Sequence, residues 1–270
     1  MSRITEAFER MRTERRPGLV TYVTAGDPSL ARSADILRAL DRAGADVLEV
    51  GVPFSDPLAD GPVIQRACER ALAAGATLDG ILHLIGTIRA SVRAPIVLFS
   101  YANPIYRMGF GAFAARAAAA GVDGVLTLDV PVEESAGIRE ALIGAGLDPI
   151  FLISPTTSLE RMRLAADLGR GFLYAISRTG VTGARASIAD GVADLVARIR
   201  TVSLLPVAVG FGLSRPEHVQ SVAAVADAAV VGSALVSVIA EAGDTPDLTP
   251  RVERYVKWLK GAPPADGLRA

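Results

Sequence analysis

Short apolar runs rich in Val, Ile and Leu alternate with longer stretches of helical period along almost the whole chain. A run of about four to eight such residues is typical of a strand buried on both faces, as in a parallel sheet. Polar, Gly and Pro residues follow most of these runs, which indicates that the strands end there. The eight predicted strands cover residues 19–23, 46–52, 95–101, 124–129, 149–154, 171–177, 206–210 and 228–232.

The stretches between these strands carry apolar residues at helical spacing. Several of them end in Gly, which favours the left-handed conformation that closes a helix. Parallel neighbouring strands need crossover connections of this kind. Eight strand–helix units therefore predict an α/β fold closed as a (β/α)8 TIM barrel, whereas about six would fit a doubly wound sheet equally well.

Two features lie outside the repeat. The first residues form an amphipathic pattern with Ile4, Phe8 and Met11 on one face, which predicts an extra N-terminal helix. The segment between the second and third predicted strands is long enough for an additional helix. No linker divides the chain, so we expect residues 1–270 to form one barrel domain, with 261–270 as a flexible tail.

The composition is that of a soluble globular protein, 50% hydrophobic and with a formal net charge of −1. This balance gives no bulk attraction to nucleic acid or to an anionic membrane. The single cysteine, Cys68, cannot form an internal disulfide, which favours a reducing compartment. The N-terminus lacks the apolar core of a signal peptide, although a chain that had lost a transit peptide would look the same. We expect a cytoplasmic protein.

Residues 221–240 contain only one charged residue, Asp227, and could be mistaken for a membrane span. The pair Gly232-Ser233 interrupts this stretch, and much of the rest is Ala and Ser. We therefore interpret it as a helix, a buried strand and the start of another helix.

Glycines at the ends of the last two strands predict a phosphate site. The seventh strand ends in GFG (210–212), and the eighth ends in GS (232–233) directly before a helical pattern. Gly lets the backbone approach an anion, and a helix N-terminus offers free amides. The alternative is that these glycines only make tight turns. The loop SRTGVTGAR (177–185) is either a lid over the substrate or an ordinary surface loop.

The residue types that are scarce in the chain limit the kinds of catalysis to be expected. The only lysines, Lys257 and Lys260, lie in the last helical pattern, so a lysine Schiff base is not expected. The two histidines, His83 and His218, lie in helical patterns, and Cys68 is isolated, so we expect no zinc or other metal site. No G-x-G-x-x-G follows the first strand, which gives dinucleotide binding no support. Carboxylates are therefore the expected proton carriers.

Glu49 and Asp60 are the best candidates among the carboxylates. Glu49 interrupts a buried apolar run near the end of the second strand, where burial favours its protonated form. The alternative is a structural Glu held by an inward Arg or Tyr. Asp60 precedes Gly and is also compatible with an ordinary turn. Asp27 and Asp56 each precede Pro, and we expect turn roles for them.

These features belong to longer motifs. The stretch LEVGVPFSDPLADGPVIQ (48–65) resembles the signature of the tryptophan synthase alpha subunit family. The resemblance extends from about residue 8 to about residue 259. Further motifs match in order and spacing, namely TAGDP (24–28), YANP (101–104), DVPVEES (129–135), SRTGVTG (177–183), GFG (210–212) and GSA (232–234).

The resemblance implies a (β/α)8 lyase of tryptophan biosynthesis that cleaves indole-3-glycerol phosphate into indole and glyceraldehyde 3-phosphate. It makes Glu49 the general acid and base, and Asp60 the group that supports positive charge on the indole nitrogen. This fits the residue inventory, because cleavage without lysine or metal needs another electron sink. Indole protonated at its C3 carbon can serve as that sink.

The resemblance also assigns the remaining site residues. Tyr22 and Phe99 stand where a Phe and a smaller aliphatic residue are expected, so the pocket is expected to pack differently. Phe172 replaces a Tyr expected beside Tyr174, so the hydrogen bond of that Tyr is not expected here. The implied substrate-binding residues are Tyr22, Phe99, Tyr101, Leu126, Tyr174 and Thr182. The implied phosphate-binding residues are Gly183, Phe211, Gly212, Gly232 and Ser233.

A partner is implied as well. It is a beta subunit that carries pyridoxal phosphate, receives indole through a tunnel and joins it to serine, in an alpha2-beta2 heterotetramer. This chain itself would need no cofactor, and Pro53 and Asp56 would face the partner. Three alternatives remain at this point: a free-standing lyase that releases indole, another phosphosugar barrel such as an isomerase, and a non-catalytic phosphate-binding regulatory barrel.

Overall fold

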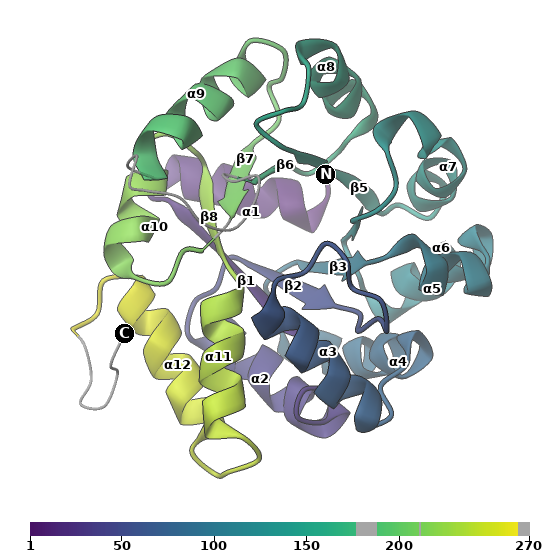
Figure 1. Cartoon of the computed structure of the whole chain (residues 1–270), viewed down its shortest axis with the longest axis vertical. Coiled ribbons are helices and arrows are strands. Elements are labelled where there is room, and N and C mark those ends of the chain that lie inside the picture. The colour runs from purple at the N-terminus through teal and green to yellow at the C-terminus, as the bar shows by residue number, and fades with distance from the viewer. Residues whose placement is uncertain (177–187, 211, 264–270) are drawn as a thin grey trace.

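The strands form a closed parallel barrel. The computed structural model describes residues 1–176, 188–210 and 212–263. Its strands pair in sequence order, and β1 pairs with β8 to close the ring, so the predicted (β/α)8 barrel is confirmed. The view of Figure 1 shows the helices surrounding the strands. The strands are β1 (Gly18–Thr24), β2 (Val47–Gly51), β3 (Ile96–Ser100), β4 (Gly124–Thr127), β5 (Asp148–Ile153), β6 (Leu173–Ile176), β7 (Val207–Gly210) and β8 (Ala228–Val231).

Both predicted additions to the repeat are present. An N-terminal helix precedes β1, and two helices connect β2 to β3. The sequence did not predict that two helices also join β3 to β4. The helices are α1 (Arg3–Thr13), α2 (Leu30–Arg42), α3 (Pro62–Ala73), α4 (Leu78–Ile88), α5 (Ala102–Met108), α6 (Phe110–Ala120), α7 (Ala136–Gly144), α8 (Leu159–Leu168), α9 (Ile188–Arg200), α10 (Pro216–Ala223), α11 (Ser233–Ala242) and α12 (Leu248–Leu259), with short 3-10 turns at Arg89–Ser91 and Val132–Glu134.

The stretch 221–240 folds as predicted. It contains the end of α10, the strand β8 and most of α11. In the described part of the chain, no single helix is long and apolar enough to cross a membrane. The helices Pro62–Ala73 and Leu78–Ser91 pass such a test only together, and they are bent by 91° against each other.

The strands carry two cores because successive side chains point to opposite faces. In β1, Leu19 and Val23 pack outward in the large cluster between the barrel and its helices. Val20 points inward and packs with apolar side chains of the other strands. Near-continuous apolar runs are thus required, since both faces of each strand are buried.

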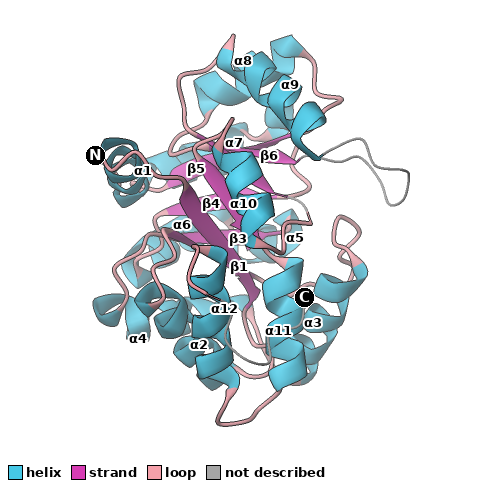
Figure 2. Ribbon diagram, turned by 90° about the vertical axis from the view of Figure 1, so that its left-hand side faces the viewer, coloured by secondary structure: helices cyan, strands magenta, loops and turns pink. Residues whose placement is uncertain are grey.

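Helix α1 closes one end of the barrel. Its predicted apolar face is buried, and Phe8 contacts Phe172 of the segment that leads into β6, with 5.4 Å between ring centroids. Figure 2 shows α1 beside the ends of the strands. Ile4 and Met11 complete this floor. The position of Phe172, where the resemblance leads us to expect a Tyr, is therefore in the apolar floor.

Aspartates hold the strand ends at this floor. Three of them immediately precede β2, β4 and β8, and each accepts a main-chain N–H near the start of the preceding strand. Such N–H groups have no ladder partner at the rim of the barrel and would be costly to bury alone. The bonds run from Leu19 to Asp46 (2.9 Å), from Ile96 to Asp123 (2.8 Å) and from Val207 to Asp227 (2.7 Å).

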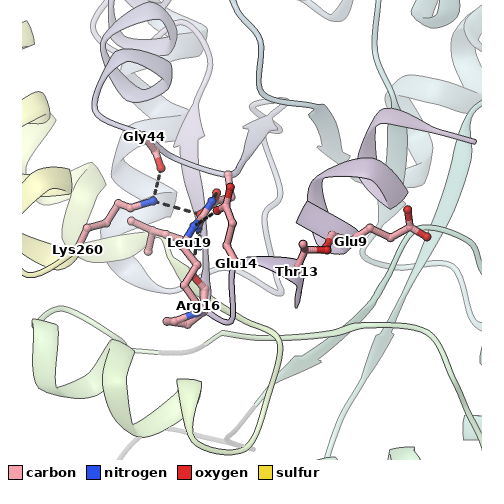
Figure 3. Close-up of polar contacts among 9 residues, drawn as sticks. Glu9, Thr13, Glu14, Arg16, Leu19, Gly44 and Lys260 are labelled. Carbon is pink, nitrogen blue, oxygen red and sulfur yellow. Dashed lines mark hydrogen bonds and ion pairs between the residues drawn. The ribbon is translucent and has the colours of Figure 1, made fainter. Parts of the chain in front are cut away.

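Asp46 also joins the two ends of the described chain. Arg16 donates to both of its carboxylate oxygens, at 2.7 and 3.0 Å, and Lys260 lies 3.3 Å away at the end of α12. Lys260 donates in addition to the carbonyl of Gly44 at 2.5 Å, as Figure 3 shows. Burial opposes ionisation of Asp46, but the bond from Arg16 and the charge of Lys260 outweigh it and lower the pKa.

Candidate active site

Glu49 lies inside the barrel without a partner. It is in register with Tyr22 of β1 and with Val97 of β3, whose side chain belongs to the interior cluster. The residue is 0% exposed. Within the described residues neither carboxylate oxygen has a hydrogen-bond partner. The structural alternative, a Glu held by an inward Arg or Tyr, finds no such contact in this part of the chain.

Burial determines the protonation of Glu49. Loss of hydration raises its pKa to about 8, because the charged form loses more solvation than the neutral one. A carboxyl group with a pKa near neutrality is able both to give and to take a proton at physiological pH. An unpaired buried carboxyl is also the kind of costly feature that concentrates at functional sites.

Asp60 reaches the same end of the barrel from the long loop between β2 and α3. The hydroxyl of Tyr101 donates to one of its carboxylate oxygens at 3.0 Å. Burial raises the pKa of Asp60, and the bond from Tyr101 opposes this rise. The same hydroxyl accepts the N–H of Ala59 at 3.0 Å, and the ring of Phe54 stacks on Tyr101 with centroids 5.1 Å apart. Asp60 is thus fixed by more than its turn.

Aromatic side chains form a wall next to Glu49. Tyr22 meets Phe99 edge to face at 5.2 Å, and Phe99 lies 6.3 Å from Tyr174. Leu126 packs with them in the interior and is 0% exposed. Burial raises the pKa of both tyrosines well above the usual value, and a negative charge on Glu49 adds to that rise. Both hydroxyls therefore stay protonated and can donate hydrogen bonds.

Two glycines make room for the tyrosine hydroxyls. A Cβ at Gly51 would lie 2.2 Å from the Tyr22 hydroxyl oxygen, and one at Gly210 would lie 2.4 Å from that of Tyr174. Only glycine fits at such approaches. The sequence motifs suggested Gly210 as part of an anion loop. In the structure, Gly210 also leaves room for the ring of Tyr174 from the neighbouring strand β6.

The glycine loops after β7 and β8 lie at the same end of the barrel, as the carboxyl ends of parallel strands must. Gly212 has a φ of +68° and open space where a side chain would be. A Cβ at Gly232 would lie 3.4 Å from Cβ of Tyr22, and Ser233 is the first residue of α11. The free amides of this helix start are suited to an anion. Thr182, Gly183 and Phe211 lie outside the described residues.

The loop that carries Asp60 is exposed at its tip. Pro53 is buried, whereas Asp56 is exposed and accepts from the hydroxyl of Ser55 at 2.7 Å. Leu58 is 93% exposed.

The contacts of His218 and Lys260 are structural. His218 Nδ1 accepts the N–H of Ser214, and Lys260 is bound to the floor of the barrel. Among the residues that the structure describes, no group of three or more His, Cys, Asp or Glu side chains is arranged to hold a metal ion.

Three polar contacts near the site were not predicted from the sequence. Gln65 of α3 donates to the carbonyl of Asp60 at 2.9 Å. Arg70 forms a two-pronged ion pair with Asp27 at 2.7 and 2.8 Å, so Asp27 is more than a turn residue. Thr24 lies 3.4 Å from the hydroxyl of Tyr22. Gln65 stands within the quoted motif, but nothing in its spacing indicates where its amide points.

Comparison with known proteins identifies the family. The sequence model of the family "Tryptophan synthase alpha chain" matches residues 8–260. The chain belongs to the tryptophan synthase alpha chain family. A tryptophan synthase alpha chain of Geotalea uraniireducens is 47% identical over 268 residues, which cover 99% of this chain and 100% of that protein. One of Solibacter usitatus is 45% identical over 260 residues, 96% of this chain and 97% of the relative.

Solved structures of this family have the same fold. The alpha subunit of Legionella pneumophila tryptophan synthase superposes with a TM-score of 0.86 at 37% identity, over 96% of this chain and 97% of that one. A structure of Mycobacterium tuberculosis tryptophan synthase gives a TM-score of 0.87 at 37% identity and 96% coverage of each chain.

Membership of the family confirms the predicted reaction class. As a tryptophan synthase alpha chain, this protein is a lyase of tryptophan biosynthesis that cleaves indole-3-glycerol phosphate. This assignment is favoured over the free-standing lyase, the phosphosugar isomerase and the non-catalytic barrel.

Proposed function

We propose that Glu49 is the general acid and base of the cleavage and that Asp60 stabilises the cation formed on the indole ring. The observation that carries this proposal is the fully buried Glu49 carboxyl, unpaired within the described residues and with a pKa raised to about 8. A group of this pKa matches the operating pH, which is the best condition for proton transfer in both directions.

The proposed steps balance without a lysine or a metal. Protonated Glu49 gives its proton to C3 of the indole ring, which leaves a positive charge shared with the ring nitrogen. Asp60, held by Tyr101, would face this nitrogen and stabilise the charge. Glu49, now a carboxylate, removes the proton of the side-chain hydroxyl. The carbon–carbon bond then breaks, its electrons neutralise the ring to give indole, and the hydroxyl carbon becomes the aldehyde.

The proposed binding residues fall into two groups, one for the indole ring and one for the phosphate. Tyr22, Phe99, Leu126 and Tyr174 would enclose the indole ring, because they form a continuous apolar and aromatic wall. Tyr101 would border the ring through its bond to Asp60. On the other side, Gly212, Gly232 and Ser233 would hold the phosphate with main-chain amides. We assign Thr182 as a further substrate contact, and Gly183 and Phe211 as further phosphate contacts, on the sequence motifs alone.

We further propose a beta subunit as partner, in an alpha2-beta2 assembly with pyridoxal phosphate in the beta subunit only. Asp56 would meet this partner, because the exposed loop tip is continuous with the loop that carries Asp60. We assign Pro53, which is buried at the start of the same loop, to this interface on the sequence motif alone. Indole released beside Asp60 would then pass to the partner. We place the assembly in the cytoplasm, where the buried thiol of Cys68 stays reduced.

The test is indole release from indole-3-glycerol phosphate by the full chain, with and without a beta subunit. Glu49→Gln is expected to lower kcat by about 10²- to 10⁴-fold, since it removes the proton carrier. Glu9→Gln, on the exposed face of α1, is the matched control and should leave kcat unchanged. Normal turnover of Glu49→Gln would overturn the assigned role. Full activity that does not respond to the beta subunit would overturn the proposed partnership.

A further inference from the structure

The loop that carries Asp60 runs from Val52 to Gly61 between β2 and α3. Its first residues are buried, whereas the tip, residues 55–59, is mostly exposed and has little packing of its own. A catalytic carboxylate needs to be held within a fraction of an ångström of its productive place. At this tip the hold has to come from polar contacts, because apolar side chains such as Leu58 point into solvent.

Two side chains outside the loop bind its main chain: the hydroxyl of Tyr101 accepts the N–H of Ala59, and Gln65 binds the carbonyl groups of the turn. Nε2 of Gln65 donates to the carbonyl oxygen of Asp60 at 2.9 Å and lies 3.5 Å from the carbonyl oxygen of Pro57. The N–H of Asp60 in turn donates to the same Pro57 carbonyl at 3.0 Å. The amide of Gln65 therefore joins both ends of the turn from Pro57 to Asp60.

The part of α3 that carries Gln65 is packed against the barrel. It lies in the first turn of α3, where its N–H donates to the carbonyl of Gly61 at 3.0 Å. Its neighbours Val63 and Ile64 pack against the cluster of Tyr22 and Val236. The helix start is thus fixed to the barrel interior next to the aromatic wall. The hydrogen bond from Gln65 of this helix to Asp60 therefore fixes the loop relative to the barrel.

We infer that Gln65 is a positioning residue for Asp60, and this rests on the role proposed above for Asp60. Tyr101 holds the carboxylate through its hydroxyl, and Gln65 holds the main chain of the same residue through its amide. Two contacts on different atoms of Asp60 fix both its place and its direction. Loss of either leaves the carboxylate present but displaced from the indole nitrogen.

The chemistry at this position requires a donor. Both atoms that face Nε2 are carbonyl oxygens, which only accept hydrogen bonds. A methionine has a similar length without a donor, so Gln65→Met removes the bond and keeps the volume. A carboxylate brings a second acceptor against the two carbonyls, and it donates only when protonated. In Gln65→Glu, the hydrogen bond from residue 65 to the loop therefore depends on pH.

We expect Gln65→Met to lower kcat and kcat/KM for indole-3-glycerol phosphate together by about tenfold, with KM nearly unchanged. Inhibition by the product glyceraldehyde 3-phosphate should remain as in the unmodified chain, because the phosphate loops follow β7 and β8. Gln220→Met is the matched control, since Gln220 is exposed on α10, and it should change none of these values.

The pH dependence of kcat in Gln65→Glu distinguishes a positioning role from a purely structural one. Its kcat relative to the unmodified chain should rise as the pH is lowered from about 8 to about 5.5, because the new carboxyl group gains a proton that it can donate. The corresponding ratio for Gln65→Met should stay flat. A flat ratio for both variants would overturn the inference.

A double-mutant cycle separates this inference from the role of Asp60 itself. If Gln65 acts through Asp60, Gln65→Met combined with Asp60→Asn is no slower than Asp60→Asn alone. A further tenfold loss in the double variant would overturn the positioning role. Normal activity of Asp60→Asn would instead overturn the proposed function. The same cycle with Tyr101→Phe, which retains the Asp60 carboxylate, gives a measurable coupling even where Asp60→Asn falls below detection.

Discussion

The hydroxyl of Tyr101 donates a hydrogen bond to the carboxylate of Asp60 across 3.0 Å, although the two residues are 41 positions apart in the chain. Tyr101 follows β3 directly, whereas Asp60 lies in the loop after β2. The parallel pairing of these strands brings both residues to the same rim. The bond has a chemical effect, because it lowers the pKa of Asp60 against the rise caused by burial.

Removing this hydroxyl should therefore shift the pH dependence of the reaction. In Tyr101→Phe the pKa of Asp60 is expected to rise further, so the acidic limb of the kcat/KM profile moves to higher pH. At neutral pH we expect about a tenfold loss, as for one hydrogen bond to a charged group. Rates measured over the pH range of the folded protein test this. Tyr106→Phe, at a residue 72% exposed, is the control, and identical profiles for the two variants would contradict the prediction.

The buried carboxyl of Glu49 predicts how stability depends on pH. Its folded pKa of about 8 lies above the ordinary value of 4.5 for a glutamate. Between these values the folded protein binds more protons than the unfolded chain, so stability is greatest at the acidic end. It falls as the pH rises, by at most about 1.4 kcal/mol per pH unit, and the loss ends above the folded pKa.

Urea unfolding at several pH values, compared with Glu49→Gln, measures this contribution. The variant cannot ionise, so its stability relative to the unmodified chain should increase from about pH 5 to about pH 8. A difference that stays constant with pH would show that Glu49 has an ordinary pKa.

The close approach of tyrosine hydroxyls to Gly51 and Gly210 predicts that a methyl group added at either position lowers stability and turnover. Gly51→Ala should displace Tyr22, and Gly210→Ala should displace Tyr174, because the new Cβ would overlap the hydroxyls. Overpacking of this kind costs about 1–3 kcal/mol of stability, and we expect turnover to fall as well. Gly111→Ala is the control, since it meets nothing within 4 Å and lies in a helix. It should be neutral or slightly stabilising. Unchanged turnover in both site variants would contradict the tight fit.

Asp46 provides a prediction about the opposite end of the barrel. Asp46→Asn should lower the free energy of unfolding by about 1–3 kcal/mol, because it weakens contacts with Arg16, Lys260 and the N–H of Leu19. The loss stays within this range because both cations are partly exposed, so solvent screens their attraction to Asp46. Since the folded pKa of Asp46 is lowered, its stabilisation is present above the unfolded pKa and is lost as the pH falls through the folded value.

Urea unfolding at neutral and acidic pH checks the role of Asp46. Asp79→Asn serves as the control, because Asp79 is 64% exposed in its ion pair with Arg116 and should contribute little. Equal losses for the two variants at neutral pH would show that burial gives Asp46 no special weight. Turnover of the remaining folded protein should be unchanged, since Asp46 lies at the far end of the strands.

Much of the barrel followed from local pattern. Both faces of β2 (Val47–Gly51) are buried, so its residues are apolar except for Glu49, which stands out in the sequence for this reason. The second helix pair, α5 and α6, was not predicted. Met108 and Phe110 flank Gly109, whose φ of +85° turns the chain, and a short helix beside an alanine-rich one leaves little periodic contrast.

The sequence by itself determined the eight-fold alternation of strands and helices, the apolar face of α1, and the two carboxylates that stand out in their surroundings. These are properties of neighbouring residues, so local spacing reveals them. Only the tertiary structure decided that Glu49 has no partner within the described residues, that Tyr101 and Gln65 hold Asp60 from two sides, and that Asp46 joins Arg16 to Lys260. Those contacts join residues on different elements, and they depend on strand register and helix placement, which no local pattern records.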